Sequence, residues 1–284
     1  MSLTFKEFLR GGKDQLAAAG FPEVDAEHLI AYLLGISRMD LHNPVTLENA
    51  LAAFADLSVI EENFWALLDR RCAHEPLQYL TGVAYFRYLE LEVGPGVLVP
   101  RPESELLVEA VLKNIEGREG AVSVVDLGSG CGALALAIAT ESPRAHLVAV
   151  EKDLAAVEWL RKNVSRIDES VRIVESDVSS ALIGVKCDVV IANPPYIPDG
   201  QELPRDVADH EPAVALYGGP DGMQIPREFI AAAARLLKSG GFLAMEHHES
   251  QAVSIAISMS EDFEGITLHN DLVGRPRFTT AIRR

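Results

Sequence analysis

Cysteine is scarce in this sequence, and its spacing argues against two kinds of site. Only three cysteines occur among 284 residues, at positions 72, 131 and 187. An odd number at such wide spacing fits neither a disulfide framework nor the paired spacing of a structural zinc site. We therefore expect Cys72, Cys131 and Cys187 to be reduced thiols in a reducing compartment, and we expect no bound metal.

Long hydrophobic runs are also missing. Hydrophobic residues make up 48% of the chain, but they occur in short stretches, whereas a membrane-spanning helix needs about 18 or more in succession. The first segment, MSLTFKEFLR, has no apolar stretch behind a basic start, which a secretory signal requires. The sequence thus predicts no membrane partner and a cytoplasmic location.

Basic residues are outnumbered by acidic ones. The chain has 25 Lys and Arg against 42 Asp and Glu, a formal net charge of -17 at pH 7. Affinity for nucleic acid depends mainly on Lys and Arg that neutralise phosphates, so a field of this sign repels a polyphosphate backbone. We therefore expect no direct DNA binding, although a local basic patch would make nucleic acid a candidate again.

The chain is long for one hydrophobic core, and its pattern changes along its length. Residues 1–80 carry apolar side chains at helical spacing, and TFKE at 4–7 and SVIE at 58–61 match the capping box of a helix N-terminus. Gly20 and Gly35 stand where helices commonly end. This part is expected to be a helical domain that recognises a partner, with helices near residues 4–19, 23–34, 47–54 and 58–73.

The remainder predicts a linker and an α/β domain. Residues 81–100 alternate apolar and polar side chains around Gly94, Pro95 and Gly96, which is the pattern of a β-hairpin linker. From residue 121 onward strand-like and helix-like segments alternate, which predicts βαβ units. We expect residues 101–284 to form a Rossmann-like domain with a mostly parallel sheet and helices on both faces.

A glycine-rich turn follows the first expected strand of that sheet, in the segment VDLGSGCGALALA at residues 125–137. Gly128, Gly130 and Gly132 allow a ligand to approach the backbone closely at a helix N-terminus. The spacing from Gly128 to Ala133 also satisfies the dinucleotide fingerprint, so an NAD-dependent oxidoreductase is one interpretation. That interpretation depends on this string alone.

Acidic residues at successive strand ends favour S-adenosylmethionine instead. Asp126 precedes the first glycine by two positions, where a carboxylate would attract a cationic ligand and repel a pyrophosphate. Glu151 ends the second strand, where it can hold ribose hydroxyls, and Asp177 follows the third, where it can meet the adenine amino edge. The candidate cofactor-binding residues are Asp126, Gly128, Ser129, Gly130, Gly132, Glu151, Lys152, Asp177, Val178 and Asn193.

The fourth strand ends in IANPPY, which deprives a sheet of hydrogen-bond donors. Pro194 keeps Asn193 extended, and Pro195 does the same to Pro194, so the turn is rigid and rich in acceptors. The Asn193 carboxamide oxygen and the Pro194 carbonyl can accept both hydrogens of a planar NH2 group, and Tyr196 offers a stacking face. An ordinary proline-rich turn is the alternative. We expect methyl transfer to nitrogen, with Asn193, Pro194 and Tyr196 as catalytic residues and Pro195 and Arg101 completing the substrate-binding set.

Several longer motifs accompany the NPPY segment (Asn193 to Tyr196). They are VLVPRPESE at 97–105, EPAVALYGGPDG at 211–222 and DLVGRPRF at 271–278. With the glycine turn, they resemble the protein-(glutamine-N5) methyltransferase family called HemK or PrmC. The resemblance implies that S-adenosylmethionine is the cofactor and S-adenosylhomocysteine the product. It also implies that the acceptor is the glutamine of the Gly-Gly-Gln tip of a class 1 peptide chain release factor, and that Arg101 borders the pocket.

Two positions depart from that family's pattern. Glu151 and Lys152 stand where an acidic and a small residue are usual, so a longer arm would reach the ribose. The fifth strand ends in EHHESQ rather than EIGxxQ, which brings His247 and His248 near the mouth of the site. Neighbouring residues on a strand point to opposite faces of the sheet, so the two histidines cannot easily bind one metal ion. We expect them to lie at the surface or behind the residues that contact the substrate.

Some alternatives stay open at this point. A nucleic-acid amino-methyltransferase acting on adenine N6 or guanine N2 would use the same NPPY segment, although the acidic charge opposes it. A non-enzymatic cofactor-binding or partner-binding protein is opposed by the intact quartet from Asn193 to Tyr196. Arg101 could equally form a salt bridge to a nearby glutamate. We expect a monomer, with a long connection from residues 197–225 that becomes ordered over the acceptor.

Overall fold

The computed structural model describes residues 5–284 and divides the chain into two compact units. The first consists of the chain up to Gly82 together with Pro204–His210, and the second consists of Val83–Leu203 and Glu211–Arg284. The capping box expected at residues 4–7 includes Thr4, which lies outside the described residues. Within residues 5–284, every helix is too short or too polar to span a bilayer.

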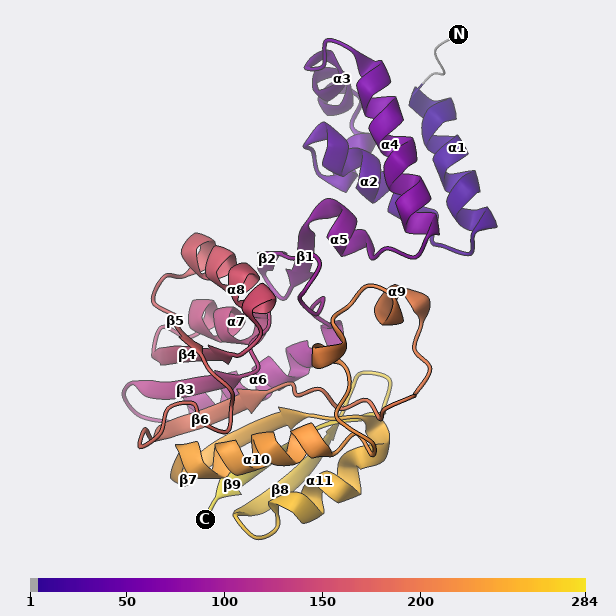
Figure 1. The fold of residues 1–284 in the computed structure, drawn as a ribbon. Helices are drawn as coiled ribbons and strands as arrows, with labels where there is room; N and C mark the ends of the chain where they lie inside the picture. The colour runs from indigo at the N-terminus through magenta and orange to yellow at the C-terminus, as the bar shows by residue number, and fades with distance from the viewer. Residues whose placement is uncertain (1–4) are drawn as a thin grey trace. The chain divides into compact units, whose positions relative to one another are not determined.

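The first unit is helical (Figure 1), as its apolar spacing predicted. Its core is one cluster in which Leu16, Leu29, Ile30, Phe64 and Leu68 are fully buried. The elements are α1 Phe5–Ala18, α2 Val24–Leu34, η1 Arg38–His42, α3 Pro44–Ala52, α4 Leu57–Cys72, α5 Leu77–Thr81 and α9 Arg205–Ala208.

Two helix starts in this unit differ from expectation. α3 begins at Pro44 because the Asn43 carboxamide oxygen accepts from the amides of Val45 and Thr46. The capping box expected at SVIE is wrong: Asp56 caps α4, accepting from the Ser58 amide at 2.9 Å. Ser58 therefore lies inside the first turn. The expected helix end at Gly35 is confirmed by its left-handed conformation, with φ of 65°.

The second unit is built around a seven-stranded sheet, preceded by a hairpin of β1 Val83–Phe86 and β2 Leu89–Glu92. The sheet order is β5-β4-β3-β6-β7-β9-β8. Strands β3 to β7 run parallel, and β9 lies antiparallel to both β7 and β8. The strands are β3 Val122–Leu127, β4 Ala145–Glu151, β5 Arg172–Glu175, β6 Cys187–Ala192, β7 Leu237–Glu246, β8 Phe263–Asn270 and β9 Pro276–Arg283.

Helices cover both faces of this sheet. In Figure 1, α10 and α11 lie side by side in front of it and α6 lies behind, with α7 packed against α6. Right-handed crossovers place α8 on the same face as α7. The expected Rossmann-like architecture is thereby confirmed. The helices are α6 Glu105–Glu116, α7 Ala133–Glu141, α8 Leu154–Ile167, α10 Gln224–Leu236 and α11 Ala252–Met259.

The hairpin turns at Arg87 and Tyr88, so the turn expected around Gly94, Pro95 and Gly96 is misplaced. Those three residues follow β2 instead. Gly94 lies so close to Trp159 that an added Cβ would stand 2.5 Å from the indole ring. The glycine is thus required by packing against α8 rather than by a hairpin turn.

A buried asparagine on α8 ties the hairpin to the glycine turn. Asn163 is fully buried, and its carboxamide accepts from the Glu92 amide at 2.7 Å and donates to the Glu92 carbonyl at 2.9 Å. It also donates to the Cys131 carbonyl at 3.0 Å. One side chain therefore satisfies three backbone groups from two segments, and the hairpin is held within the second unit.

Replacing Asn163 should destabilise this unit. Asn163→Ala leaves the buried Cys131 carbonyl and the partly buried amide and carbonyl of Glu92 without this partner, and we expect a loss of about 2–4 kcal/mol in the free energy of unfolding. Asn114→Ala on α6, whose side chain meets Arg118, is the matched control and should change stability by less than about 0.5 kcal/mol. Urea denaturation followed by Trp159 fluorescence in a Trp65→Phe background measures both. Equal stabilities for the two variants would contradict the assigned role.

Candidate functional site

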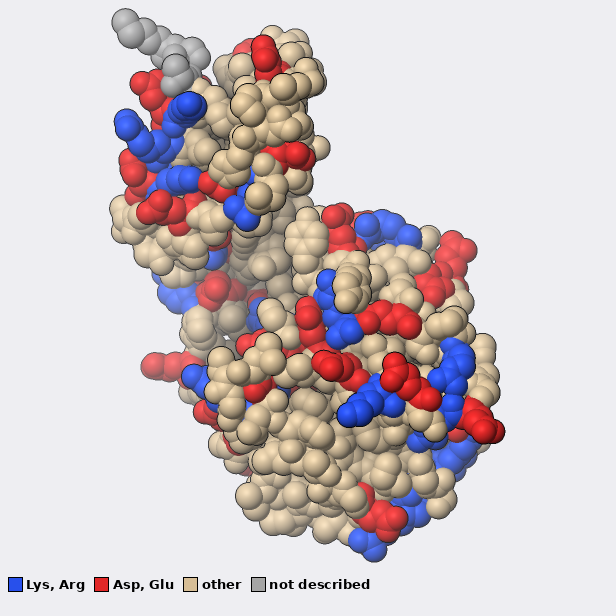
Figure 2. Space-filling view, turned by 180° about the vertical axis from the view of Figure 1, so that it is seen from behind, with Lys and Arg blue, Asp and Glu red and all other residues tan. Residues whose placement is uncertain are grey.

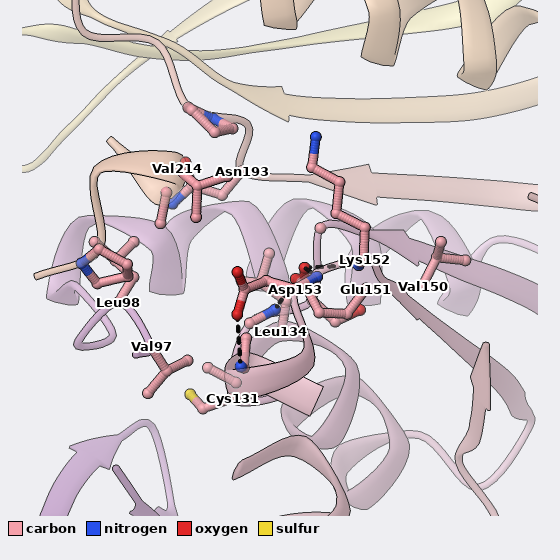
Figure 3. Close-up of a pocket in the computed structure, with 18 of the residues that line it drawn as sticks. Val97, Leu98, Cys131, Leu134, Val150, Glu151, Lys152, Asp153, Asn193 and Val214 are labelled. Carbon is pink, nitrogen blue, oxygen red and sulfur yellow. Dashed lines mark hydrogen bonds between the residues drawn. The ribbon is translucent and has the colours of Figure 1, made fainter. Parts of the chain in front are cut away.

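The carboxyl ends of β3, β4, β5 and β6 surround a pocket (Figure 3) that encloses about 1240 Å³ of space, its open mouth included. It lies where the strand order reverses, which is where open α/β sheets bind ligands. Its lining is mostly apolar with a few convergent polar groups, which is typical of cofactor and small-molecule sites. Apolar walls come from Val97, Leu98, Leu134, Val150, Val178, Ile225 and Phe229.

The glycine turn forms the floor of the pocket. Gly128, Ser129 and Gly130 line it, and the amides of Gly128 and Ser129 are fixed by the Val150 carbonyl at 2.9 and 3.0 Å. Gly130 has φ of 55°, a backbone conformation that side chains disfavour. Gly132 is not among the lining residues: a Cβ there would stand 2.7 Å from Leu160, so this glycine serves helix packing.

Glu151 closes the turn against the end of β4. One carboxylate oxygen accepts from the Gly130 amide at 2.9 Å, and the other accepts from the amides of Lys152 and Asp153 at 2.8 and 2.9 Å. Figure 3 shows this carboxylate among its backbone partners at the pocket wall. It therefore fixes the turn and also presents an acceptor to a ligand hydroxyl.

Asp177 and Val178 line the pocket next to Lys152, beyond the end of β5. One Asp177 oxygen accepts from the amide and hydroxyl of Ser179, and these bonds lower the pKa of Asp177. The other oxygen faces the Lys152 ammonium at 3.4 Å. This rim is therefore polar, whereas the adjoining wall is apolar.

Asp126 is not among the residues that line the pocket. The structure therefore does not place its carboxylate in direct contact with a bound cation. The side chain is fully buried, and neither oxygen has a well-formed hydrogen bond within residues 5–284. Burial raises the pKa of Asp126 to about 7, although nearby Ser129 and the Ala135 amide lower it. The expected cofactor contact is therefore replaced by a buried group beneath the glycine turn.

The NPPY segment divides its residues between the pocket and the interior. Asn193 and Pro195 line the pocket, whereas Pro194 is buried. Tyr196 is not among the lining residues, so the expected stacking face is not presented there. Its hydroxyl donates to the buried Glu246 carboxylate at 3.1 Å, and its pKa is raised by burial and by that carboxylate.

Three residues that sequence reasoning did not select hold this segment. Ser104 accepts from the Asn193 carboxamide at 3.2 Å, and Glu246 accepts from Ser104 at 2.5 Å. Gln251 donates to the carbonyls of Tyr196 and Gly222 at 2.8 and 3.0 Å. Their only sequence signal was membership of the PRPESE and EHHESQ motifs.

Arg101 combines both roles considered for it. It lines the pocket, and its guanidinium donates to both oxygens of Glu211 at 2.7 and 2.8 Å. Glu211 is buried, so the pair fixes the start of the segment whose Pro212 and Val214 form part of the wall. The two alternatives drawn from the sequence are thus compatible.

The two histidines of EHHESQ differ in environment. His247 is fully buried and bonds to the Thr279 hydroxyl at 2.9 Å, so a surface position is wrong for it, and burial lowers its pKa. His248 caps the short helix η4, Glu249–Gln251, where its ring nitrogen accepts from the Ser250 amide. Among residues 5–284, no three His, Cys, Asp or Glu side chains converge as metal ligands would.

The long connection folds back on itself beside the pocket. The Ile197 amide donates to the Leu216 carbonyl at 2.9 Å, and the Gly218 amide returns a bond to Ile197 at 2.8 Å. The Asp199 amide donates to Gly219 at 2.9 Å. Its two ends are therefore fixed against each other without a ligand, while the expected ordering over an acceptor stays a prediction.

Basic and acidic side chains are interspersed on the face that Figure 2 shows. Several basic side chains of the second unit are paired, with Arg87 bound to Glu141, Arg161 to Glu175 and Lys238 to Asp188. Pairing of this kind reduces the unopposed positive charge that phosphates would need.

Comparison with known proteins shows which family this chain resembles. The model of the methyltransferase small domain matches residues 102–210, and that of the PrmC N-terminal domain matches residues 7–82. Release factor glutamine methyltransferases of Mycolicibacterium smegmatis and Streptomyces coelicolor are 44% and 38% identical to this chain. Each match covers 94% of this chain and 94% of the relative.

Solved structures agree on the fold. A 16S rRNA N2 methyltransferase of Thermus thermophilus, in complex with AdoMet and guanosine, matches with a TM-score of 0.52 at 25% identity, over 71% of this chain and 50% of that one. A methyltransferase from Pyrococcus furiosus matches with a TM-score of 0.52 at 22% identity, over 69% and 88%. The second likeness bears on the fold alone.

The buried Asp126 makes stability depend on pH. Because its pKa is raised to about 7, the folded state keeps a proton that the unfolded state releases near pH 4. Stability should therefore fall with rising pH between about 4 and 7, by at most about 1.4 kcal/mol per pH unit. Asp126→Asn should remove this contribution and raise the melting temperature most above pH 7. The exposed Asp199→Asn is the control, and parallel melting curves for both variants across this range would refute the assignment.

Proposed function

Because this chain belongs to the family of release factor glutamine methyltransferases, we propose that it transfers a methyl group from S-adenosylmethionine to a protein glutamine. The acceptor is the side-chain amide nitrogen, N5, of the glutamine in the Gly-Gly-Gln motif of class 1 peptide chain release factors. The observation that carries the proposal is a single pocket lined by the glycine turn, Glu151 and Asn193. One end suits a nucleoside and the other suits an amide.

The pocket fits S-adenosylmethionine by the chemistry of its walls. Glu151 offers carboxylate oxygens to ribose hydroxyls, and Asp177 and Val178 border a slot for the adenine. Gly128 and Gly130 have no side chains, so the cofactor can approach the backbone of the turn closely. When bound, the cofactor supplies an electrophilic methyl on a positively charged sulfur. The acidic residues around the site favour that charge.

Asn193 then positions the acceptor. An amide nitrogen is a poor nucleophile because its lone pair is delocalised, so orientation must supply much of the rate. Asn193 lines the pocket, and its carboxamide oxygen accepts one N–H bond of the glutamine, while the carbonyl of the otherwise buried Pro194 accepts the other. Both bonds favour the charge that develops on nitrogen. We assign no general base, and the proton leaves the nitrogen late, to solvent. Pro195 and Arg101 complete the wall on the acceptor side.

The helical unit is proposed to recognise the release factor. Support comes from the match of the PrmC N-terminal domain to residues 7–82. We further propose that the protein acts as a monomer in the cytoplasm, where its substrate works, and that the connection of residues 197–225 becomes ordered over the Gly-Gly-Gln tip.

The alternatives drawn from the sequence have less support. Transfer to adenine or guanine would use the same NPPY segment, but the relatives that match over 94% of their length act on release factors by name. A net charge of -17 also opposes a polyphosphate substrate. The oxidoreductase interpretation had only the GxGxxA spacing behind it, and a purely binding function leaves the NPPY geometry without a purpose.

The direct test is an assay with purified protein, methyl-labelled S-adenosylmethionine and a release factor. Label should enter the wild-type release factor and should not enter one whose Gly-Gly-Gln glutamine is replaced. Asn193→Ala should lower kcat by about 100-fold or more, because transition-state hydrogen bonds of this kind are worth that much. Its affinity for S-adenosylhomocysteine should stay within a few-fold. Asn270→Ala, an exposed asparagine at the end of β8, is the control; comparable turnover in both variants would remove Asn193 from the mechanism.

Glu151→Gln should act on cofactor binding instead. The substitution keeps one carbonyl oxygen but loses the charged acceptor, so affinity for S-adenosylhomocysteine should fall by about 10-fold or more. Titration calorimetry measures this affinity directly. Glu175→Gln, at the end of β5 and outside the pocket lining, should bind like the wild type. If Glu151→Gln kept wild-type affinity, the ribose contact would have to lie elsewhere.

A further inference from the structure

A chain of buried polar groups stands behind Asn193, at the pocket edge where Figure 3 labels it. The Asn193 Nδ2 donates to Ser104 Oγ at 3.2 Å, and Ser104 Oγ donates to Glu246 Oε2 at 2.5 Å. The Tyr196 hydroxyl donates to the other oxygen of Glu246 at 3.1 Å. Ser104 is 3% exposed and lines the pocket beside Asn193, and Glu246 is 1% exposed.

The direction of each bond follows from counting protons. Burial raises the pKa of Glu246, whereas the bonds from Ser104 and Tyr196 and the charge of Arg277 lower it. The 2.5 Å distance from Ser104 to Glu246 lies in the range of a hydroxyl bonded to a charged oxygen, and an ionised carboxylate only accepts. Ser104 has one proton, and it is committed to Glu246. The serine oxygen can then only accept from Asn193, so it is the NH2 end of the carboxamide that must face Ser104.

This order decides what the pocket recognises. The two ends of an asparagine carboxamide are nearly equal in size, and the NPPY sequence by itself does not choose between them. With NH2 held by Ser104, the Asn193 oxygen faces the acceptor and matches an N–H donor. Reversed, the carboxamide would present N–H bonds to the glutamine NH2 and would instead suit a carboxylate.

We propose that Ser104 and Glu246 are positioning residues that fix the direction of the Asn193 carboxamide and so make the site select a carboxamide acceptor over a carboxylate. The inference rests on the proposed function. Tyr196 supports the same arrangement from the far side of Glu246, which gives this residue a role other than stacking on the substrate.

Three variants test the inference. Ser104→Ala removes the fixed acceptor, Ser104→Thr keeps a hydroxyl, and Glu246→Gln supplies an NH2 group that can donate to Ser104. In the last case the direction of the serine proton is no longer fixed, so both orientations of the Asn193 carboxamide become accessible. The measurements are kcat and KM with the intact release factor, affinity for S-adenosylhomocysteine, and affinity for release factors that carry Gly-Gly-Gln or Gly-Gly-Glu in the presence of that product.

Ser104→Ala should lower kcat by about 10-fold or more with cofactor affinity within a few-fold, and Ser104→Thr should restore kcat. The preference for Gly-Gly-Gln over Gly-Gly-Glu should shrink in both Ser104→Ala and Glu246→Gln. A purely structural role would lower both affinities together and leave their ratio unchanged. Retained affinity for S-adenosylhomocysteine shows that a variant is folded. If Glu246→Gln loses this affinity, Ser104→Ala, which deletes only one hydroxyl, still tests the inference.

Two failures are distinguishable. A wild-type protein that methylates the release factor, together with a Ser104→Ala variant of unchanged kcat and unchanged preference, would overturn the inference and leave the proposed function standing. A wild-type protein that transfers no label to the Gly-Gly-Gln release factor would overturn the proposed function, and the inference with it.

Discussion

The pairing of β3 with β6 is the constraint on which the site depends. Leu127 stands opposite Ala192 in this parallel pair, so the residues that follow, Gly128 and Asn193, leave the sheet at the same level. The next strands along the chain lie on opposite sides, because β4 pairs with β3 and β7 pairs with β6. Their connecting helices depart to opposite faces and leave the space above the two strand ends open. The sheet thereby brings the glycine turn and the NPPY segment to one pocket.

The same arrangement explains why so many polar groups are buried around the NPPY segment. Pro194 and Pro195 have no backbone N–H groups, so this segment offers few donors of its own. Buried carbonyls in and near it therefore need hydrogen-bond donors from other segments. Gln251 provides N–H bonds to the Tyr196 and Gly222 carbonyls, and it joins the NPPY segment to the loop that borders the pocket. Rigidity at the acceptor end is therefore produced by satisfied hydrogen bonds and not by the prolines alone.

Sequence reasoning succeeded where the signal is local. The glycine turn, the strand ends at Glu151 and Asn193, and the alternation of strands and helices are all set by spacing within about ten residues, and the structure has them at the expected places. It was wrong where the outcome depends on what lies across space. Asp126 faces the start of α7 near the Ala135 amide, and no spacing rule distinguishes that from facing the pocket. Asn163 meets Glu92 from 71 positions away. Local rules also failed at α4, where Asp56 and Ser58 compete to cap one helix.

Glu246 raises the question of why a buried carboxylate is kept at all. A carboxylate taken out of water is costly even when it is well bonded, and a neutral residue of similar shape often does no harm to stability. Burial raises the pKa of Glu246, which shows the cost, although Ser104, Tyr196 and Arg277 oppose the shift. A glutamine in its place would satisfy the same neighbours, yet it can donate as well as accept, so the direction of the Ser104 proton would no longer be fixed. Only a group that accepts and cannot donate imposes one direction on this chain of hydrogen bonds. The buried carboxylate thus lowers stability, but it holds the Asn193 carboxamide in a single orientation.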